Sequence, residues 1–159
     1  MSTPKLYLAG GLFNAGERLH NLYLEKYLKE LGYEVILPQR EALEFFKDGI
    51  LDIPAVAEAC CMSAMTSHNL FVGCIDGPDA DSGTCVEFGM AIAATRRALV
   101  YRTDIRTAPE KEVGMNAMLK SEGSIFIYEP CYITELSEID SFYKKLAFKI
   151  DEVISKCLM

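Results

Sequence analysis

The chain lacks tryptophan and has only two histidines, and its six cysteines form no C-x-x-C pair. Without such ligands at short spacing, no metal site is expected. Basic residues are also scarce, because 16 Lys and Arg stand against 23 Asp and Glu, for a net charge of −7. A nucleic-acid-binding protein normally presents a basic face, so this balance argues against DNA or RNA as a partner.

Long hydrophobic runs are missing as well. The longest apolar stretches have the length of a strand, and residues 1–5 lead straight into one of them, so neither a signal peptide nor a membrane span is predicted. The cysteines show no paired spacing and four lie in apolar segments, which predicts buried free thiols in a reducing compartment. We therefore expect a cytoplasmic protein with no membrane partner. The cysteines are Cys60, Cys61, Cys74, Cys85, Cys131 and Cys157.

The sequence does contain a regular alternation of apolar strands and amphipathic helices. Its 159 residues, 50% hydrophobic and 25% charged, predict one globular domain over residues 1–159. Strands are expected at residues 5–10, 33–37, 70–75, 98–102 and 124–128, and helices at 17–31, 53–66, from 82 or 84 to about 94, and 136–156. This alternation predicts an α/β fold: a doubly wound, flavodoxin-like, five-stranded parallel sheet with helices on both faces.

A doubly wound sheet binds its ligands over the carboxyl ends of its strands. Four loops, all polar or glycine-rich, are expected at that edge: residues 10–14, 38–40, 76–83 and 103–116. The helical spacing also predicts which side chains face the core. In the first helix these are Leu19, Leu22, Tyr23, Tyr27 and Leu31, followed by Gly32 as a stop. In the last helix they are Ile139, Phe142, Tyr143, Leu146, Ile150, Val153 and Ile154.

Residues 76–89 carry four carboxylates in a turn-rich stretch between an apolar strand and a helix of small residues. Ser82 or Thr84 is predicted to cap this helix. Glu87 then falls in the first turn, where unpaired backbone N–H groups favour an ionised carboxylate. Such a carboxylate is a candidate nucleophile or general base. Asp81, six residues earlier, is expected on the loop above it.

Three groups of residues resemble, in order and spacing, the nucleoside 2-deoxyribosyltransferase family over roughly residues 5–130. They are Tyr7-Leu8-Ala9-Gly10 with Phe13; Asp76-Gly77 with Asp81-Ser82-Gly83-Thr84-x-x-Glu87-x-Gly89-x-Ala91; and Asn116-Ala117-Met118. Each group alone is a weak signal, but their order is fairly specific.

The resemblance implies transfer of a 2-deoxyribosyl group between nucleobases, with 2′-deoxynucleosides and free nucleobases as substrates and no cofactor. Glu87 would attack the anomeric carbon, Asp81 would contact and protonate the base, and Tyr7 would orient Glu87. Asn116 would reach the 5′-hydroxyl from a neighbouring subunit, in a homodimer or larger homo-oligomer with shared sites. The same motifs place Gly10, Phe13, Asp76, Gly83 and Met118 among the substrate-binding residues.

The chain departs from this family at one position and leaves two other functions open. Relatives often carry aspartate where Cys61 stands, which predicts a changed base preference rather than loss of activity. A sister group hydrolyses deoxynucleoside 5′-monophosphates and tends to carry serine at the position of Asn116; Arg102 and Arg106 keep that alternative open, whereas Glu110 and Glu112 would repel a phosphate. The third candidate is a nucleotide-binding module without turnover.

Several of these residues also have a purely structural interpretation. Without the family pattern, Glu87 is better explained as a surface charge favoured by the helix dipole than as a catalytic residue. Asp79 is best explained as part of a solvated turn. Tyr7 has the position of a core aromatic, Asn116 that of a helix cap, and His20 that of a structural or exposed side chain.

Overall fold

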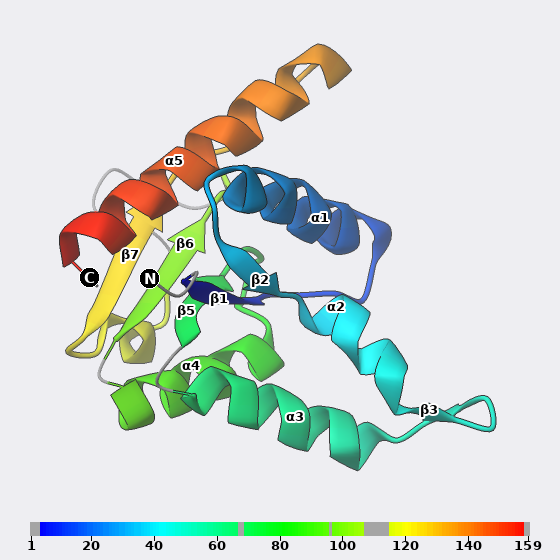
Figure 1. Cartoon of the computed structure of the whole chain (residues 1–159). Helices are drawn as coiled ribbons and strands as arrows, with labels where there is room; N and C mark the ends of the chain where they lie inside the picture. Colours follow the sequence, from blue (N-terminus) through cyan, green and yellow to red (C-terminus); the bar gives the residue numbers. More distant parts are fainter. Residues whose placement is uncertain (1–3, 67–68, 96, 107–114, 158–159) are drawn as a thin grey trace.

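The computed structural model of the chain describes residues 4–66, 69–95, 97–106 and 115–157. At its centre lies a five-stranded parallel sheet in the order β2-β1-β5-β6-β7 (Figure 1). The strands are β1 (Lys5–Ala9), β2 (Glu34–Ile36), β5 (Asn69–Cys74), β6 (Ala98–Arg102) and β7 (Ser124–Tyr128). This architecture confirms the predicted fold class. The strands are continuous apolar runs because helices cover both faces of the sheet.

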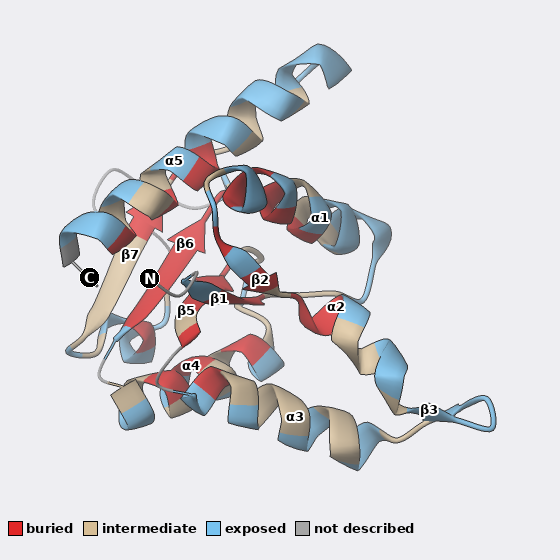
Figure 2. Ribbon diagram, in the orientation of Figure 1, coloured by how far each residue is buried: buried red, intermediate tan, exposed pale blue. Residues whose placement is uncertain are grey.

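Four long helices cover the two faces of the sheet (Figure 1). Helices α1 (Ala15–Glu30) and α5 (Ile139–Cys157) pack against each other on one face, and α3 (Ile53–Met65) and α4 (Ser82–Thr95) pack on the other. Burial is concentrated in the central strands and on the helix surfaces that face them (Figure 2). Short 3-10 turns, η2 (Ala117–Lys120) and η3 (Leu136–Glu138), precede β7 and α5. None of the helices in the described ranges has the length and apolar character needed to cross a membrane.

The strands divide the core into two clusters, because alternate side chains point to opposite faces. Leu6 and Leu8 of β1 face α1 and α5, whereas Tyr7 and Ala9 face α3 and α4. Tyr7 is therefore a buried aromatic on the same side of the sheet as α4. Its hydroxyl is the polar end of an otherwise apolar cluster.

The inward face of α1 is rotated relative to the predicted one. Leu19 and Leu22 are 55% and 43% exposed, so their predicted core positions are wrong. Two polar residues occupy the inward surface in their place: Glu25 accepts two hydrogen bonds from the Arg40 guanidinium at 2.6 and 2.5 Å, and Asn21 binds the loop after β1. The residues that α1 buries are Asn21, Leu24, Glu25, Tyr27 and Leu28.

Residues 38–52 contain elements that were not predicted; only residues 38–40 were assigned, as a loop. Pro38 begins a short helix, α2 (Pro38–Glu41), as proline favours the first helical turn. A 3-10 turn, η1 (Ala42–Phe45), leads into a small antiparallel hairpin of β3 (Phe46–Lys47) and β4 (Ile50–Leu51). Asp48 and Gly49 join its strands with φ of 51° and 79°, the positive values that a two-residue hairpin turn requires. The predicted loop 103–116 lies partly outside the described residues, which lack 107–114.

The strand order reverses between β1 and β5. From β1 the chain proceeds to β2 on one side, and from β5 to β6 and β7 on the other. In a doubly wound fold the loops that follow the two strands diverge at this point and open a crevice over their carboxyl ends. The loops after β1 and β5 are residues 10–14 and 75–81, so the glycine-rich and acidic segments of the sequence meet there.

Candidate active site

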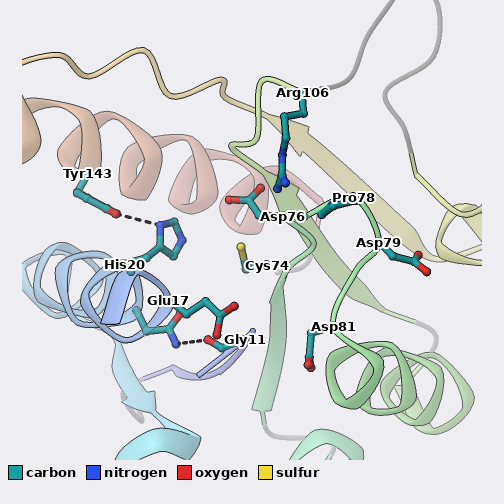
Figure 3. A pocket seen from close by; sticks show the side chains of 13 residues that line it. Gly11, Glu17, His20, Cys74, Asp76, Pro78, Asp79, Asp81, Arg106 and Tyr143 are labelled. Atoms are coloured by element: carbon teal, nitrogen blue, oxygen red, sulfur yellow. Dashed lines mark hydrogen bonds between the residues drawn. The ribbon is translucent and has the colours of Figure 1, made fainter. Parts of the chain in front are cut away.

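A cavity of about 550 Å³ opens at this point of reversal (Figure 3). Its walls come from the loop after β1 with the first turns of α1, from the loop between β5 and α4, and from Arg106 and Tyr143. The volume is within the range of small-molecule sites, which is about 300–1,000 Å³. The cavity is therefore large enough for a nucleoside.

The loop after β1 is held by two side chains of α1. Glu17 folds back and accepts a hydrogen bond from the Phe13 backbone N–H at 2.8 Å, while Asn21 donates to the Gly11 carbonyl at 3.0 Å. A side chain at position 11 would meet the Glu17 carboxyl carbon at 2.6 Å, so glycine is needed there for Glu17 to reach the loop. Gln39 of α2 in turn accepts from Asn21 at 3.0 Å. The loop is therefore fixed by groups on two helices.

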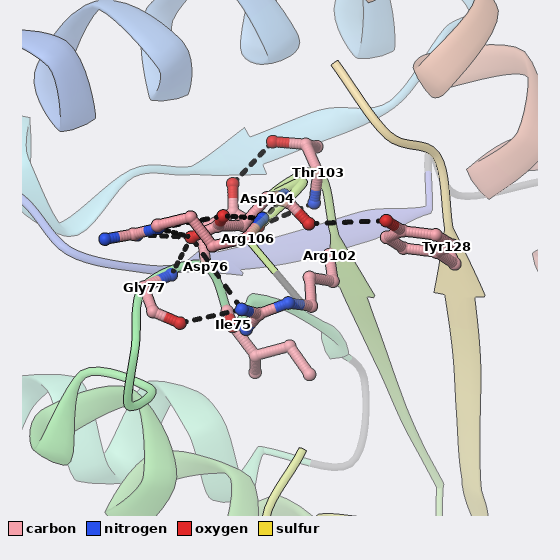
Figure 4. Close-up of polar contacts among 8 residues, drawn as sticks. All are labelled: Ile75, Asp76, Gly77, Arg102, Thr103, Asp104, Arg106 and Tyr128. Carbon is pink, nitrogen blue, oxygen red and sulfur yellow. Dashed lines mark hydrogen bonds and ion pairs between the residues drawn. The ribbon is translucent and has the colours of Figure 1, made fainter. Parts of the chain in front are cut away.

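The loop after β5 is held by the end of β6 (Figure 4). The Asp76 carboxylate accepts hydrogen bonds from the backbone N–H groups of Thr103 and Asp104 at 2.6 and 2.9 Å. The buried Arg102 guanidinium donates to the carbonyls of Ile75 and Gly77 at 2.6 and 2.8 Å. Asp104 accepts from the Gly77 N–H at 2.9 Å. Arg102 is therefore committed to the backbone of this loop and is not placed to bind a substrate phosphate.

Asp81, rather than Ser82 or Thr84, caps helix α4. Its Oδ2 accepts from the Thr84 backbone N–H at 2.8 Å and from the Thr84 hydroxyl at 2.9 Å. Gly83 leaves room for this cap, since a Cβ there would lie 3.2 Å from the same oxygen. Because α4 begins at Ser82, Glu87 lies in its second turn, and the predicted first-turn position is wrong.

Glu87 is instead defined by its contact with Tyr7. The Tyr7 hydroxyl donates to Glu87 Oε1 at 2.8 Å, joining β1 to α4 across 80 residues of sequence. Burial raises the pKa of Glu87 above its usual value, and the negative charge of Asp81 raises it further, while hydrogen bonds from Tyr7 and the Cys60 thiol act in the opposite direction. The pKa of Tyr7 is also raised, mainly by its burial. The net shift is upward, so burial outweighs the hydrogen bonds that this carboxylate accepts.

Glu87 is not among the residues that line the two neighbouring cavities, but its contacts are. Asp81, whose charge it senses, lines the large cavity, and Tyr7 lines a smaller one of about 90 Å³ between α2, η1 and α3. Cys60 of α3 lines the smaller cavity beside Tyr7. Among the described cysteines only Cys74 is fully buried; the others are partly exposed free thiols, which corrects the prediction that they are buried.

A hydrogen-bonded row of rings forms the wall opposite Asp81 (Figure 3). His20 Nδ1 lies 3.0 Å from the Tyr143 hydroxyl, and His20 Nε2 lies 2.9 Å from the Tyr101 hydroxyl. Burial lowers the pKa of His20, against the opposing effect of Asp76, so the imidazole is neutral near pH 7. The Tyr101 hydroxyl also contacts the Cys74 thiol at the floor of the cavity.

The cavity is acidic. Four carboxylates line it, and the one guanidinium among its described lining residues is Arg106, which is paired with Asp104. A bound phosphate would meet these charges at close range in a partly desolvated site. The electrostatics therefore favour a neutral or cationic ligand. The four carboxylates belong to Glu17, Asp76, Asp79 and Asp81.

Of the predicted site residues, Asp76 and Asp81 are among the described residues that line the large cavity. The others are not: Tyr7, Gly10, Phe13, Gly83, Glu87, Asn116 and Met118. Phe13 and Met118 are each 79% exposed. Asn116 caps η2 by accepting from the Met118 N–H at 3.0 Å, and η2 precedes the amino end of β7, away from the carboxyl edge. Gly10 packs against β5, since a Cβ there would lie 3.1 Å from the Cβ of Cys74. Within the described ranges, no three His, Cys, Asp or Glu side chains are grouped as metal ligands.

A family model described as nucleoside 2-deoxyribosyltransferase matches residues 6–124, well over half of the chain. The chain belongs to the nucleoside 2-deoxyribosyltransferase family. The resemblance found in the sequence is thereby confirmed. The matched range contains Tyr7, Asp81, Glu87 and Asn116, whose individual roles remain predictions.

Solved structures related to this family member share its fold. A conserved protein from Enterococcus faecalis V583 aligns with a TM-score of 0.70 at 22% identity, over 95% of this chain and 99% of that one. A 2-deoxyribosyltransferase from Bacillus psychrosaccharolyticus aligns with a TM-score of 0.56 at 19% identity, over 86% and 90% of the two chains. The CMP N-glycosidase BcmB from Clostridium botulinum aligns with a TM-score of 0.54 at 17% identity, over 93% and 98%. No curated protein matches the chain.

The family motifs leave part of the cavity wall unassigned. Glu17, His20, Asn21 and Tyr143 all line it, but the sequence marks none of them as a site residue. Glu17 and His20 lie one turn apart at the start of the helix that follows the Gly10-Gly11 loop, and this position at a sheet edge was the one signal available. Tyr143 lies more than a hundred residues away in the last helix, where nothing local distinguishes it from other core aromatics.

Proposed function

We propose that this family member transfers a 2-deoxyribosyl group between nucleobases through a covalent intermediate on Glu87. The observation that carries the proposal is the 2.8 Å hydrogen bond from the Tyr7 hydroxyl to Glu87 Oε1. It holds a partly buried carboxylate in one orientation beside Asp81, which lies at the edge of a nucleoside-sized cavity. Transfer with retention requires a fixed carboxylate nucleophile and a second acid near the leaving base.

The reaction has two balanced steps. In the first, a Glu87 oxygen bonds to C1′ as the C1′–N bond breaks, and the leaving base takes a proton, for which Asp81 is the proposed donor. In the second, a nitrogen of the incoming base bonds to C1′, the Glu87–C1′ bond breaks, and the proton of that base returns to Asp81. The transition state has oxocarbenium character, and the missing 2′-hydroxyl makes it easier to reach. These steps involve only side chains, sugar and bases.

Hydrolysis of deoxynucleoside 5′-monophosphates is the second candidate. Arg106 favours it, because this residue lines the large cavity and a phosphate could replace Asp104 as the partner of its guanidinium. The four carboxylates of the same wall oppose it, and Arg102 is occupied by the backbone of the Asp76 loop. A binding module without turnover ranks third, since binding alone needs no Tyr7–Glu87 pair.

Product analysis separates the three candidates. The protein is incubated with deoxyinosine alone, with deoxyinosine and adenine, and with deoxyinosine 5′-monophosphate. Formation of deoxyadenosine only when adenine is present supports transfer. Release of hypoxanthine only from the monophosphate assigns the protein to the hydrolases and overturns the proposal. No product in any reaction, with the ligands bound, assigns it to the binding modules.

The proposed active unit is at least a dimer in which Asn116 serves the site of the adjacent chain. Asn116 caps η2 and is not among the residues that line the large cavity of its own chain, which supports this arrangement. We expect Glu87→Ala and Asn116→Ala proteins, each inactive, to recover activity when mixed and allowed to exchange subunits. Random exchange gives about a quarter of the wild-type activity at most, because half of the dimers contain one intact site. Exchange without recovery, or a fully active monomer in sedimentation, contradicts the shared site.

A further inference from the structure

We propose that Tyr143, supported by His20, reads the edge of the nucleobase farthest from the glycosidic bond, at position 6 of a purine or position 4 of a pyrimidine. This inference rests on the proposed function, because it places a base in the large cavity. It assigns a specificity role to residues outside the family motifs. It also names the substrate class as bases that carry either an oxo or an amino group at that edge.

The placement of the base follows from the two ends of the cavity. Asp81 lies at one end, and His20 and Tyr143 lie at the other, with Glu17 and Asp76 between them (Figure 3). Glu87 is not among the residues that line this cavity, but it lies close enough to Asp81 for their charges to interact. A sugar bound at Glu87 therefore brings the glycosidic nitrogen of its base near Asp81. Its opposite edge then extends toward the far wall. The hydroxyl of Tyr143 is a hydrogen-bonding group on that wall.

The row of rings allows this hydroxyl either to donate or to accept. In one arrangement Tyr101 O–H donates to His20 Nε2, and Nδ1–H donates to the Tyr143 oxygen, so the Tyr143 proton is available to an oxo group of the base. In the other, Tyr143 O–H donates to Nδ1, and Nε2–H donates to the Tyr101 oxygen. The Tyr143 oxygen then accepts from an amino group of the base.

Both arrangements keep the buried polar groups of the row partnered. Tyr101 is fully buried, and in the second arrangement its proton is directed to the Cys74 thiol that it contacts. Leaving a buried donor without a partner would cost about 1–3 kcal/mol. Neither arrangement of the row has this cost, so the Tyr143 hydroxyl can act as donor or as acceptor at similar free energy. An enzyme that exchanges one base for another benefits from such a wall, since leaving and incoming bases differ in this group.

The test uses three 2′-deoxynucleosides that differ at position 6: deoxyadenosine with an amino group, deoxyinosine with an oxo group, and purine 2′-deoxyriboside with hydrogen. Cleavage of each is measured with wild-type protein and with Tyr143→Phe, which keeps the ring and removes the hydroxyl. We expect kcat/KM to fall about fivefold to tenfold for the first two, the effect of one lost neutral hydrogen bond. For the purine deoxyriboside we expect less than a twofold change.

Tyr23→Phe is the matched control. The Tyr23 ring stacks on Tyr143, with centroids 5.2 Å apart, but Tyr23 is not among the described residues that line the cavity. Its three rates should not change. Equal losses with all three substrates in Tyr143→Phe assign that hydroxyl a structural role and overturn the inference, and so does the absence of any loss.

Failure of the proposed function is detected separately. If wild-type protein cleaves none of the three nucleosides, calorimetric binding of adenine, hypoxanthine and unsubstituted purine replaces the rates. Weaker binding of the first two bases to Tyr143→Phe, with unchanged binding of purine, supports the reading of the base edge without catalysis. Any other pattern of binding overturns it.

Discussion

Glu87 and Asp104 are carboxylates near the same end of the sheet, and their surroundings move their pKa values in opposite directions. The Arg106 guanidinium beside Asp104 holds the pKa of that carboxyl well below its usual range, with further hydrogen bonds from the backbone N–H groups of Arg106 and Gly77. Glu87 has no cation among its described partners, and burial raises its pKa. Its hydrogen bonds come from the neutral Tyr7 hydroxyl and Cys60 thiol.

The difference indicates which carboxylate is available for chemistry. Asp104 is paired with Arg106, and its oxygens also hold the loop at Gly77. Glu87 is oriented by hydrogen bonds but has no described cationic partner, so in the proposed reaction its negative charge is available to stabilise the positive charge that develops on the sugar. Hydrogen bonds from neutral donors position a nucleophile, whereas an ion pair would make it less reactive. Each of the following predictions removes one element of this contrast.

Removal of the Glu87 carboxylate should have the largest effect. We expect Glu87→Ala to fold normally and to lose at least about a thousandfold in kcat, because no neighbouring group replaces a covalent nucleophile. Mass spectrometry of wild-type protein trapped with substrate should place the sugar on Glu87. Glu58→Ala, an exposed glutamate on α3, is the control and should keep full activity. An adduct on another residue, or more than about a tenth of the activity in Glu87→Ala, contradicts the assignment.

Asp81→Asn should have the next largest effect, and it should depend on the leaving group. Asparagine also caps helices well, so the hydrogen bonds to Thr84 and the start of α4 should survive. Loss of a proton donor should slow cleavage of natural nucleosides by about 10²–10⁴-fold. A nitrophenyl 2-deoxyriboside needs no proton on its leaving group, and its cleavage should be nearly unchanged. Equal losses with both substrates would show that Asp81 acts in some other way.

The strands and the outer helices could be predicted from the sequence because their signals are local. Five apolar runs, most of them separated by helical repeats, define the sheet, and Gly32, with φ of 95°, follows the end of α1 as expected. Prediction failed where a buried polar group determines the structure. Nothing local shows that Glu25 turns inward to pair with Arg40, and so the face of α1 was assigned incorrectly.

The candidate site was predictable only in part, because its residues converge from distant segments. The family pattern drew attention to Glu87 and Tyr7, but no local rule brings together residues 80 positions apart. The upward shift in the pKa of Glu87 could not be predicted for the same reason. The sequence shows that Glu87 lies near the start of a helix. The burial that raises its pKa depends on packing between β1, α3 and α4, which the sequence does not show. His20 and Tyr143 required the complete fold before they could be found.

Asp104→Asn tests whether the ion-paired carboxylate of the comparison serves stability rather than catalysis. We expect a loss of about 1–2 kcal/mol in unfolding free energy at pH 7, since a charged hydrogen-bonded pair is removed, with kcat falling much less than in Glu87→Ala. The folded-state pKa of Asp104 lies below its unfolded value, so this stabilisation is complete above that value and is lost as pH falls through the folded-state pKa. Urea denaturation should therefore show wild type and variant converging below about pH 4.

Glu152→Gln, which breaks an exposed i,i+4 pair, is the control and should change little. Failure to converge in acid would mean that the ion pair is not the source of the stability.

Tyr7→Phe should have the smallest effect on the maximal rate and the clearest effect on the pH profile. The hydrogen bond from Tyr7 lowers the pKa of Glu87 against the effect of burial, so its removal should raise that pKa further. In the proposed mechanism Glu87 attacks as the carboxylate. The acid limb of kcat/KM should therefore move to higher pH, by about one to two units for a hydrogen bond worth about 1.5–3 kcal/mol to a charged group. Near the alkaline plateau the loss should be about tenfold or less, because the carboxylate is present but less well oriented.

Tyr33→Phe is the control. It removes a similar hydrogen bond, from Tyr33 to Asp151 at 2.6 Å on the far side of the core, and should leave the pH profile unchanged. If the acid limb stays in place in Tyr7→Phe, or moves to lower pH, the tyrosine does not control the charge of Glu87. The contrast between Glu87 and Asp104 would then lose its basis.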